Sequence, residues 1–168
     1  MLHDDPAARA PVLQRAVARY FQESAISVQP WRSGVDYDAY LVSSRRWARA
    51  VLRVPHIERT ITSYDESVDF ATIMEKEVLV HGLLTEAGVP CPAVIGWDTS
   101  HAEVEWSWML VSYVEHEPVE SLGASALVEL GRIARRIHAI ETVDARLQVP
   151  GETWTSFIAT RIEQRLAS

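Results

Sequence analysis

Two residues of opposite charge, Arg53 and Glu77, stand inside otherwise apolar patterns. Arg53 interrupts the apolar run Ala50–Val54, and because the side chains of a β-strand alternate, Arg53 shares a face with Val51. Glu77 falls within the apolar stripe of a following helical segment, which also contains Phe70, Ile73, Met74, Val80, His81 and Leu84. A charged group that faces inward needs a partner of opposite charge. The sequence therefore predicts an ion pair between a strand and a helix.

Other residues of chemical interest have ordinary structural interpretations. Cys91 lies between two prolines and is expected to be a small packed residue, not a nucleophile. His138 falls on an apolar helical stripe and is interpreted as a core histidine. The segment Ser33–Asp36 contains one glycine and is typical of a hairpin turn.

Composition limits the classes of function. The chain has 168 residues, 48% of them hydrophobic, which is enough to bury a core, and its net charge is −7. A negative chain is unsuited to non-specific nucleic-acid binding but would attract a cationic ligand. No apolar run approaches the roughly 20 residues of a membrane span, and no signal peptide is recognisable at the start. One cysteine cannot form a disulfide within the chain, so we expect a cytoplasmic protein.

The elements that would position Arg53 and Glu77 follow from periodicity and turn residues. A helix starting at Asp5-Pro6 is followed by strands over residues 26–31, 37–42 and 47–54. Ser63 and Glu66 have the spacing of a capping box, which predicts a helix from there to Gly88. Two more strands are predicted at 91–97 and 106–114, a helix around Leu127–Ile140 and a last helix from Gly151. The expected class is α+β: about five antiparallel strands with one inserted helix in residues 1–114, then a short break and helices in 115–168.

The order of these pieces resembles the N-terminal lobe of a protein kinase, and in detail the aminoglycoside phosphotransferase family. The similarity runs from about Ile26 to Ile140 and rests on the order and spacing of several short segments. These are Ser33-Gly34-Val35-Asp36-Tyr37, Val51-Leu52-Arg53-Val54-Pro55, Glu75-Lys76-Glu77, Ala87-Gly88-Val89-Pro90-Cys91-Pro92, Leu110-Val111-Ser112-Tyr113-Val114, Leu130-Gly131-Arg132-Ile133-Ala134 and Ile137-His138.

The resemblance implies a nucleotide site for ATP or GTP with Mg²⁺. Arg53 would bind the α- and β-phosphates, and Glu77 would orient it. The turn at Ser33-Gly34 would lie over the phosphates, where Asp36 and Asp38 would repel them unless they point away or a cation intervenes. The adenine edge would meet the backbone C=O of Ser112 and N–H of Val114. The alternative for Arg53 and Glu77 is a pair that only ties the helix to the sheet.

The sequence departs from this family in its catalytic parts. Phosphoryl transfer needs a catalytic aspartate, an asparagine that binds metal and a second metal-binding aspartate. The chain contains no asparagine, so the catalytic loop is absent. We therefore assign no catalytic residue and no metal ligand. The resemblance implies the N-terminal lobe, hinge and first helices of a small-molecule kinase, truncated before its catalytic loop.

Three hypotheses remain open from the sequence. In the first, the chain is part of a phosphotransferase for an aminoglycoside, macrolide or similar hydroxylated compound, with a cationic small molecule as the expected acceptor. It would then expose an apolar surface able to self-associate. Alternatively, it is a complete, non-catalytic module that binds a nucleotide or a partner. The third hypothesis is an α+β domain that shares only the order of strands and turns.

Overall fold

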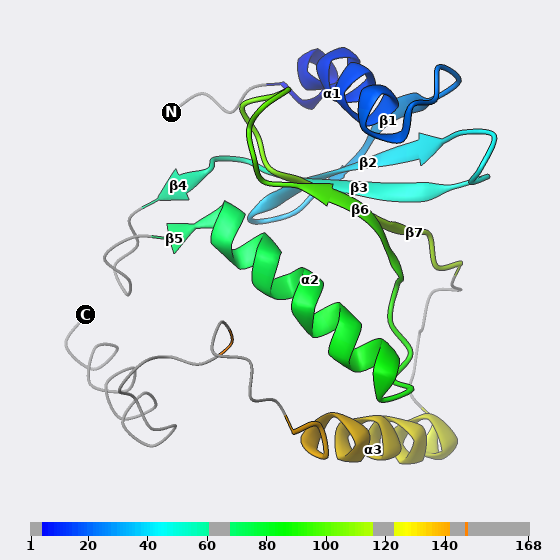
Figure 1. The fold of residues 1–168 in the computed structure, drawn as a ribbon. Coiled ribbons are helices and arrows are strands. Elements are labelled where there is room, and N and C mark those ends of the chain that lie inside the picture. Colours follow the sequence, from blue (N-terminus) through cyan, green and yellow to red (C-terminus); the bar gives the residue numbers. More distant parts are fainter. Residues whose placement is uncertain (1–4, 61–67, 116–122, 142–146, 148–168) are drawn as a thin grey trace.

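The computed structural model describes residues 5–60, 68–115, 123–141 and 147 (Figure 1). Five strands form one antiparallel sheet in the order β1-β2-β3-β7-β6, and two short strands form a second sheet. The elements are α1 (Pro6–Phe21), β1 (Ser27–Ser33), β2 (Tyr37–Ser43), β3 (Ala50–Pro55), β4 (Arg59–Thr60), β5 (Val68–Asp69), α2 (Phe70–Glu86), β6 (Val94–Asp98), β7 (Trp108–Ser112) and α3 (Ala124–His138). The predicted α+β class, with five antiparallel strands and an inserted helix, is confirmed.

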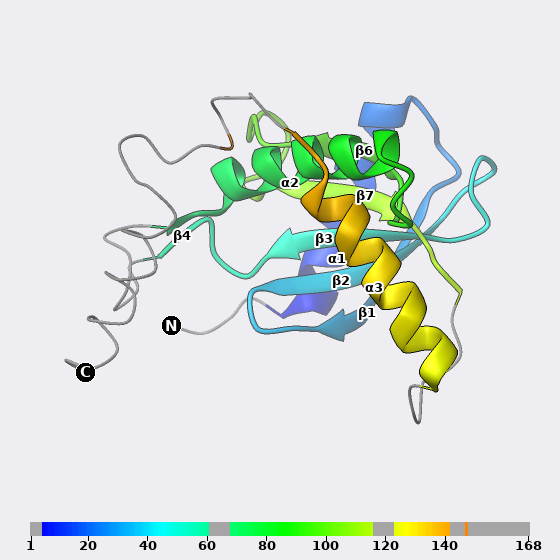
Figure 2. The ribbon, with the colours of Figure 1, turned by 90° about the horizontal axis from the view of Figure 1, so that it is seen from below.

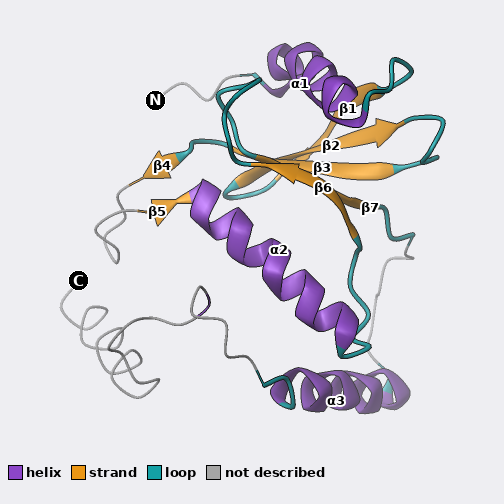
Figure 3. Ribbon diagram, in the orientation of Figure 1, coloured by secondary structure: helices purple, strands orange, loops and turns teal. Residues whose placement is uncertain are grey.

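Helices α1 and α2 cover opposite faces of the five-stranded sheet (Figure 3). Strand β3, in the middle of the sheet, shows the alternation that produces these two faces. Leu52 and Val54 are fully buried on the α1 side, whereas Val51 packs with Met74 of α2 on the other side. Arg53 follows Val51 by two residues and therefore lies on the α2 side, as the alternation predicts.

Helix α1 begins as the sequence predicts. The side chain of Asp5 accepts a hydrogen bond from the N–H of Ala7 at 3.0 Å, and Pro6 occupies the first turn. Gln22, in the left-handed conformation with φ of 52°, ends the helix by donating its N–H to backbone carbonyls of the last turn.

Helix α2 begins later than predicted. Ser63 and Glu66 lie outside the described residues, and Val68–Asp69 is a strand that pairs with Arg59–Thr60. The side chain of Asp69 caps the helix by accepting from the N–H of Thr72 at 3.2 Å. The expected helical start was wrong for residues 68 and 69, because antiparallel pairing with β4 places them in a strand. Arg59 and Thr60, for which no strand is predicted from the sequence, supply that partner strand.

The strand ends differ from prediction by a few residues. The third strand starts at Ala50 instead of Trp47, because the backbone N–H and carbonyl of Trp47 bond to Ser44 and close the hairpin. The predicted strand 91–97 is Val94–Asp98, and 106–114 is Trp108–Ser112. The helix predicted from Gly151 lies outside the described residues.

Helix α3 lies near the C-terminal end of α2, on the side of the sheet opposite α1 (Figures 1 and 2). Arg136 of α3 donates to the carbonyl of Gly88 at 3.0 Å. No residue of α3 is buried. His138, interpreted from the sequence as a core histidine, is exposed, because the apolar stripe of this helix packs against none of the described elements. The proposed boundary at residue 114 stays a prediction.

Among the described residues, the helices are too short or too polar to cross a membrane.

Candidate functional site

The ion pair predicted between Arg53 and Glu77 is present. Nη1 of Arg53 lies 2.7 Å from Oε2 of Glu77, and Nη2 lies 3.4 Å from Oε1, so the guanidinium and the carboxylate meet as two parallel forks. Each side chain is 30% exposed. The pair thus links the central strand β3 to α2 and still reaches the surface.

Tyr37 of β2 completes this group of residues, although its role is not predicted from the sequence. The guanidinium carbon of Arg53 lies 4.4 Å from the centroid of the Tyr37 ring. Ala39 is directly opposite Arg53 in the β2–β3 pairing. Tyr37, two residues before Ala39, is therefore the diagonal neighbour of Arg53 on the same face of the sheet. The signal that could have found it is this register, which the predicted strand ends at residues 42 and 47 do not give, because the observed pairing places Val42 opposite Ala50.

The environment of the Tyr37 ring is mostly apolar. The ring of Phe70, the first residue of α2, meets it edge-on with centroids 5.6 Å apart. The Tyr37 hydroxyl is buried and has no hydrogen-bond partner among the described residues. Burial first, and then the Glu77 carboxylate, raises the pKa of Tyr37 to about 12, so the side chain is neutral at physiological pH.

A hollow of about 390 Å³ opens beside the ion pair. Its lining combines three charged side chains with a histidine and apolar residues of α2: Arg53, Lys76, Glu77, His81, Ile73, Val80 and Leu84. A guanidinium has five N–H donors, and the two bonds to Glu77 use only two of them. Arg53 therefore retains donors for an anion that enters from the open side.

The predicted turn at Ser33-Gly34 joins β1 to β2. The N–H of Gly34 donates to the carbonyl of Tyr37 at 2.8 Å and closes the turn. The hydroxyl of Ser33 donates to Oδ1 of Asp38 at 2.8 Å and lies 3.2 Å from Nε2 of His56. That hydroxyl is thus already engaged, and the turn offers a ligand mainly its backbone.

Asp38 points away from the α2 side of the sheet. Its carboxylate lies 3.7 Å from Nη1 of Arg9 in α1 and 3.2 Å from Nε2 of His56. Asp38 and Arg9 are both buried, with side chains 6% and 4% exposed. The expected repulsion between Asp38 and a phosphate is therefore relieved by its orientation, while Asp36 is exposed.

Ser112 and Val114, predicted to meet the adenine edge, lie at and beyond the end of β7. The N–H of Ser112 donates to the carbonyl of Ala93 at 2.8 Å, and its hydroxyl accepts from the N–H of Ala93 at 2.9 Å. Val114 is 53% exposed. The contacts of both residues with a nucleotide remain a prediction.

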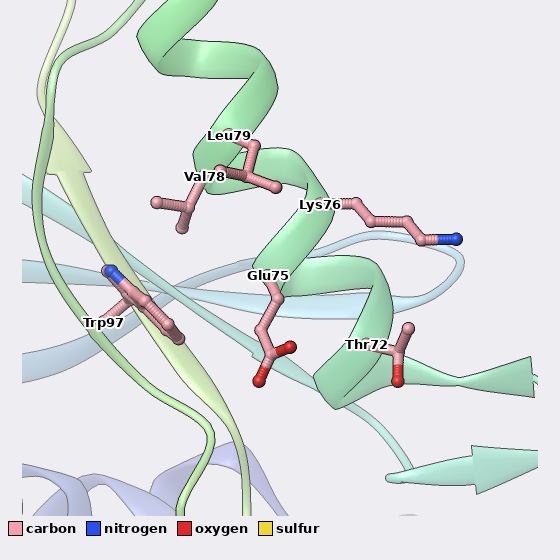
Figure 4. A pocket seen from close by; sticks show the side chains of 6 residues that line it. All are labelled: Thr72, Glu75, Lys76, Val78, Leu79 and Trp97. Carbon is pink, nitrogen blue, oxygen red and sulfur yellow. The ribbon is translucent and has the colours of Figure 1, made fainter. Parts of the chain in front are cut away.

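A second hollow, of about 290 Å³, lies between α2 and β6 and does not include Arg53 or Glu77 (Figure 4). The indole of Trp97 faces Val78 across it, whereas Lys76 extends away. The carboxylate of Glu75 accepts from the hydroxyl of Thr99 at 2.9 Å. This hollow holds no convergent set of ionic groups comparable to that at Arg53.

Cys91 is half-buried and contacts the hydroxyl of Thr85 and the carbonyl of His81 through its sulfur, at 3.7 and 4.0 Å. This fits the predicted packed thiol. Within the described ranges, no group of three or more His, Cys, Asp or Glu side chains could hold a metal ion.

Comparison with known proteins identifies the family of the chain and a similar fold. The comparison with curated protein sequences gives no match. Among solved structures, the fold is similar to that of a protein from Ralstonia eutropha JMP134 named as a candidate aminoglycoside phosphotransferase, with a TM-score of 0.61 and 15% sequence identity. The similarity covers 94% of this chain and 47% of that one, so this chain spans about half the length of that protein. The model of the phosphotransferase enzyme family (APH) matches residues 27–167. The chain therefore belongs to the phosphotransferase enzyme family.

Proposed function

We propose that this chain forms the nucleotide-binding part of an ATP- or GTP-dependent O-phosphotransferase for a small hydroxylated compound of the aminoglycoside or macrolide type. The observation that carries the proposal is the bidentate pair between Arg53 and Glu77 on the α2 side of the sheet. Family membership supports the reaction class. The acceptor and the nucleotide are inferred from the resemblance.

In this proposal, each residue has one task. Arg53 binds the α- and β-phosphates with the donors that Glu77 leaves free, and Glu77 keeps the guanidinium pointed at them. The turn at Ser33-Gly34 covers the phosphates with its backbone, and Ser112 and Val114 bind the adenine edge through a C=O and an N–H. A bound nucleotide would supply the phosphoryl group.

The described residues suit phosphate binding better than metal binding. The guanidinium fork matches two phosphate oxygens. Mg²⁺ requires oxygen ligands, of which the described residues provide no suitable group of three. We therefore assign no metal ligand and no chemical step to these residues. Separately, the single cysteine favours a reaction in the cytoplasm, where thiols stay reduced.

Titration calorimetry with ATP and Mg²⁺ tests the proposal on the chain itself. We expect binding that weakens at least tenfold, or about 1.4 kcal/mol, in Arg53→Ala. Arg45→Ala is the matched control, because Arg45 is exposed at the tip of the β2–β3 hairpin, far along the strands from Arg53. Absence of heat at millimolar nucleotide, or equal weakening in both variants, would contradict a nucleotide site at Arg53.

A non-catalytic binding module is the second candidate, because the pair between Arg53 and Glu77 can hold an anion without any chemical step. The two candidates differ in one measurement. Nucleotide binding by this chain, combined with phosphoryl transfer by the protein encoded by the complete gene, supports the phosphotransferase. Binding with no transfer to any hydroxylated acceptor supports the module.

A further inference from the structure

We propose that Tyr37 is a positioning residue for Arg53: its ring holds the guanidinium in the orientation that presents N–H donors to the phosphates. This inference rests on the proposed nucleotide site and adds a residue to it. It also explains why an arginine suits position 53.

The contacts around Arg53 restrain it from two directions. The Tyr37 ring lies 4.4 Å from the guanidinium carbon, and the Glu77 carboxylate binds the two terminal nitrogens at 2.7 and 3.4 Å. The ring lies against the guanidinium carbon, whereas the carboxylate binds the terminal nitrogens, so the two contacts use different atoms of the group. Together they restrain the guanidinium from two sides.

The ring that positions Arg53 is itself held in place. Tyr37 begins β2, and its carbonyl accepts the N–H of Gly34 in the turn before it. Phe70 packs edge-on against the ring, with centroids 5.6 Å apart. Tyr37 thus contacts three parts of the proposed site: the turn at Gly34, Arg53 of β3 and the start of α2.

This arrangement is specific for arginine. A lysine ammonium is a compact charge that cannot stack its face on Tyr37 and bind Glu77 as a fork at the same time. Arg53→Lys should therefore lose much of its binding because the interaction with the ring is lost. In a chain without the ring, the same substitution should cost less.

The Tyr37 hydroxyl is separable from the ring. It is buried without a hydrogen-bond partner among the described residues, so its removal leaves no new unsatisfied group. Tyr37→Phe is therefore the matched control that keeps the ring, and Tyr37→Leu is the variant that removes it. Tyr37→Met provides a second variant without a ring if Tyr37→Leu fails to fold.

The experiment is a double-mutant cycle between Tyr37→Leu and Arg53→Lys, read by calorimetry with ATP and Mg²⁺. We expect Tyr37→Phe to bind within about twofold of the original chain and Tyr37→Leu to bind at least fivefold more weakly. Arg53→Lys should weaken binding at least threefold less in the Tyr37→Leu background than in the original. Additive effects of the two substitutions, or equal loss in Tyr37→Phe and Tyr37→Leu, would overturn the proposal.

A second readout needs no nucleotide. In the ¹H–¹⁵N spectrum, the Nε–H of Arg53, identified by its absence in Arg53→Lys, should show a ring-current shift that Tyr37→Phe keeps and Tyr37→Leu removes. An unchanged resonance in Tyr37→Leu would overturn the positioning role. If the shift behaves as expected and no variant binds ATP, the proposed nucleotide site is wrong while the contact of Tyr37 with Arg53 stands, so the two failures are distinguishable.

Discussion

Adjacent residues of β2 serve opposite faces of the sheet. Tyr37 packs beneath the guanidinium of Arg53 on the α2 side, whereas Asp38 faces α1 and binds Arg9, Ser33 and His56. Because side chains alternate along β2, Tyr37 and Asp38 anchor the start of this strand to Arg53 on one face of the sheet and to α1 on the other. Nη1 and Nη2 of Arg9 also donate to the carbonyls of Pro55 and His56, at 3.1 and 2.9 Å, so this buried network joins α1 to the end of β3.

Replacing Asp38 by asparagine tests the importance of this network for stability. The substitution leaves the shape of the side chain but removes the buried negative charge that faces Arg9. Removing one charge of a buried pair in this way costs about 3 kcal/mol, because the attraction between the two desolvated charges is lost. Urea denaturation should show a loss of this size for Asp38→Asn.

The control lies two residues away. Asp36 is exposed, and Asp36→Asn should change the free energy of unfolding by less than about 0.5 kcal/mol. Equal losses in the free energy of unfolding for the two substitutions would show that the buried charge of Asp38 does not stabilise the fold.

At the scale of elements, the end of α1 packs closely against the edge strand β6. A Cβ atom at Gly96 would come within 2.6 Å of Cζ of Phe21 and 3.0 Å of Cε1 of Tyr20. These rings belong to a cluster of aromatic residues, in which Phe21 also meets Trp47 with centroids 4.7 Å apart. A glycine at position 96 therefore permits α1 to approach the sheet.

Gly96→Ala should destabilise the protein by about 1–3 kcal/mol, because the methyl group forces the aromatic rings to move. Thermal or urea unfolding measures this loss. Gly82→Ala is the opposite control: Gly82 lies in α2, is exposed, and a Cβ there would meet nothing within 4 Å. It should stabilise by about 0.5–1 kcal/mol through helix propensity. Stabilisation in both variants would contradict the close contact.

At the scale of the whole molecule, α3 presents an apolar stripe without cover from the described elements. Leu127, Leu130 and Ile137 are 57%, 49% and 43% exposed, and their spacing places them on one side of the helix. Exposed apolar stripes of this kind are typical of surfaces that pack against another part of a protein or another protein chain. The chain spans about half the length of the Ralstonia protein, and we keep the prediction that this stripe makes the chain self-associate.

Sedimentation velocity over a range of concentrations tests self-association. We expect the weight-average sedimentation coefficient of the chain to rise with concentration and to stay at the monomer value in Leu130→Glu. Ser125→Glu adds the same charge on the opposite side of α3, where Ser125 is exposed, and should leave association unchanged. A monomer at every concentration would contradict the prediction.

The sequence by itself determined the features that depend on local periodicity. Alternation along β3 and the helical spacing of α2 were sufficient to predict the contact between Arg53 and Glu77, because each pattern states which side of its element faces inward. The cap at Asp5, the five main strands and the helix after Gly123 were predicted for the same reason, with ends displaced by a few residues.

Only the tertiary structure decided the features that depend on which segments pair or pack together. The pairing of Arg59–Thr60 with Val68–Asp69 delayed the start of α2, although the local capping signal at Ser63 pointed to an earlier one. The register between β2 and β3 placed Tyr37 beneath Arg53, and the packing of α1 gave Asp38 its cation, Arg9. No local pattern contains these partners, because a side chain's own periodicity gives its direction, whereas the residue it meets depends on how the chain folds back.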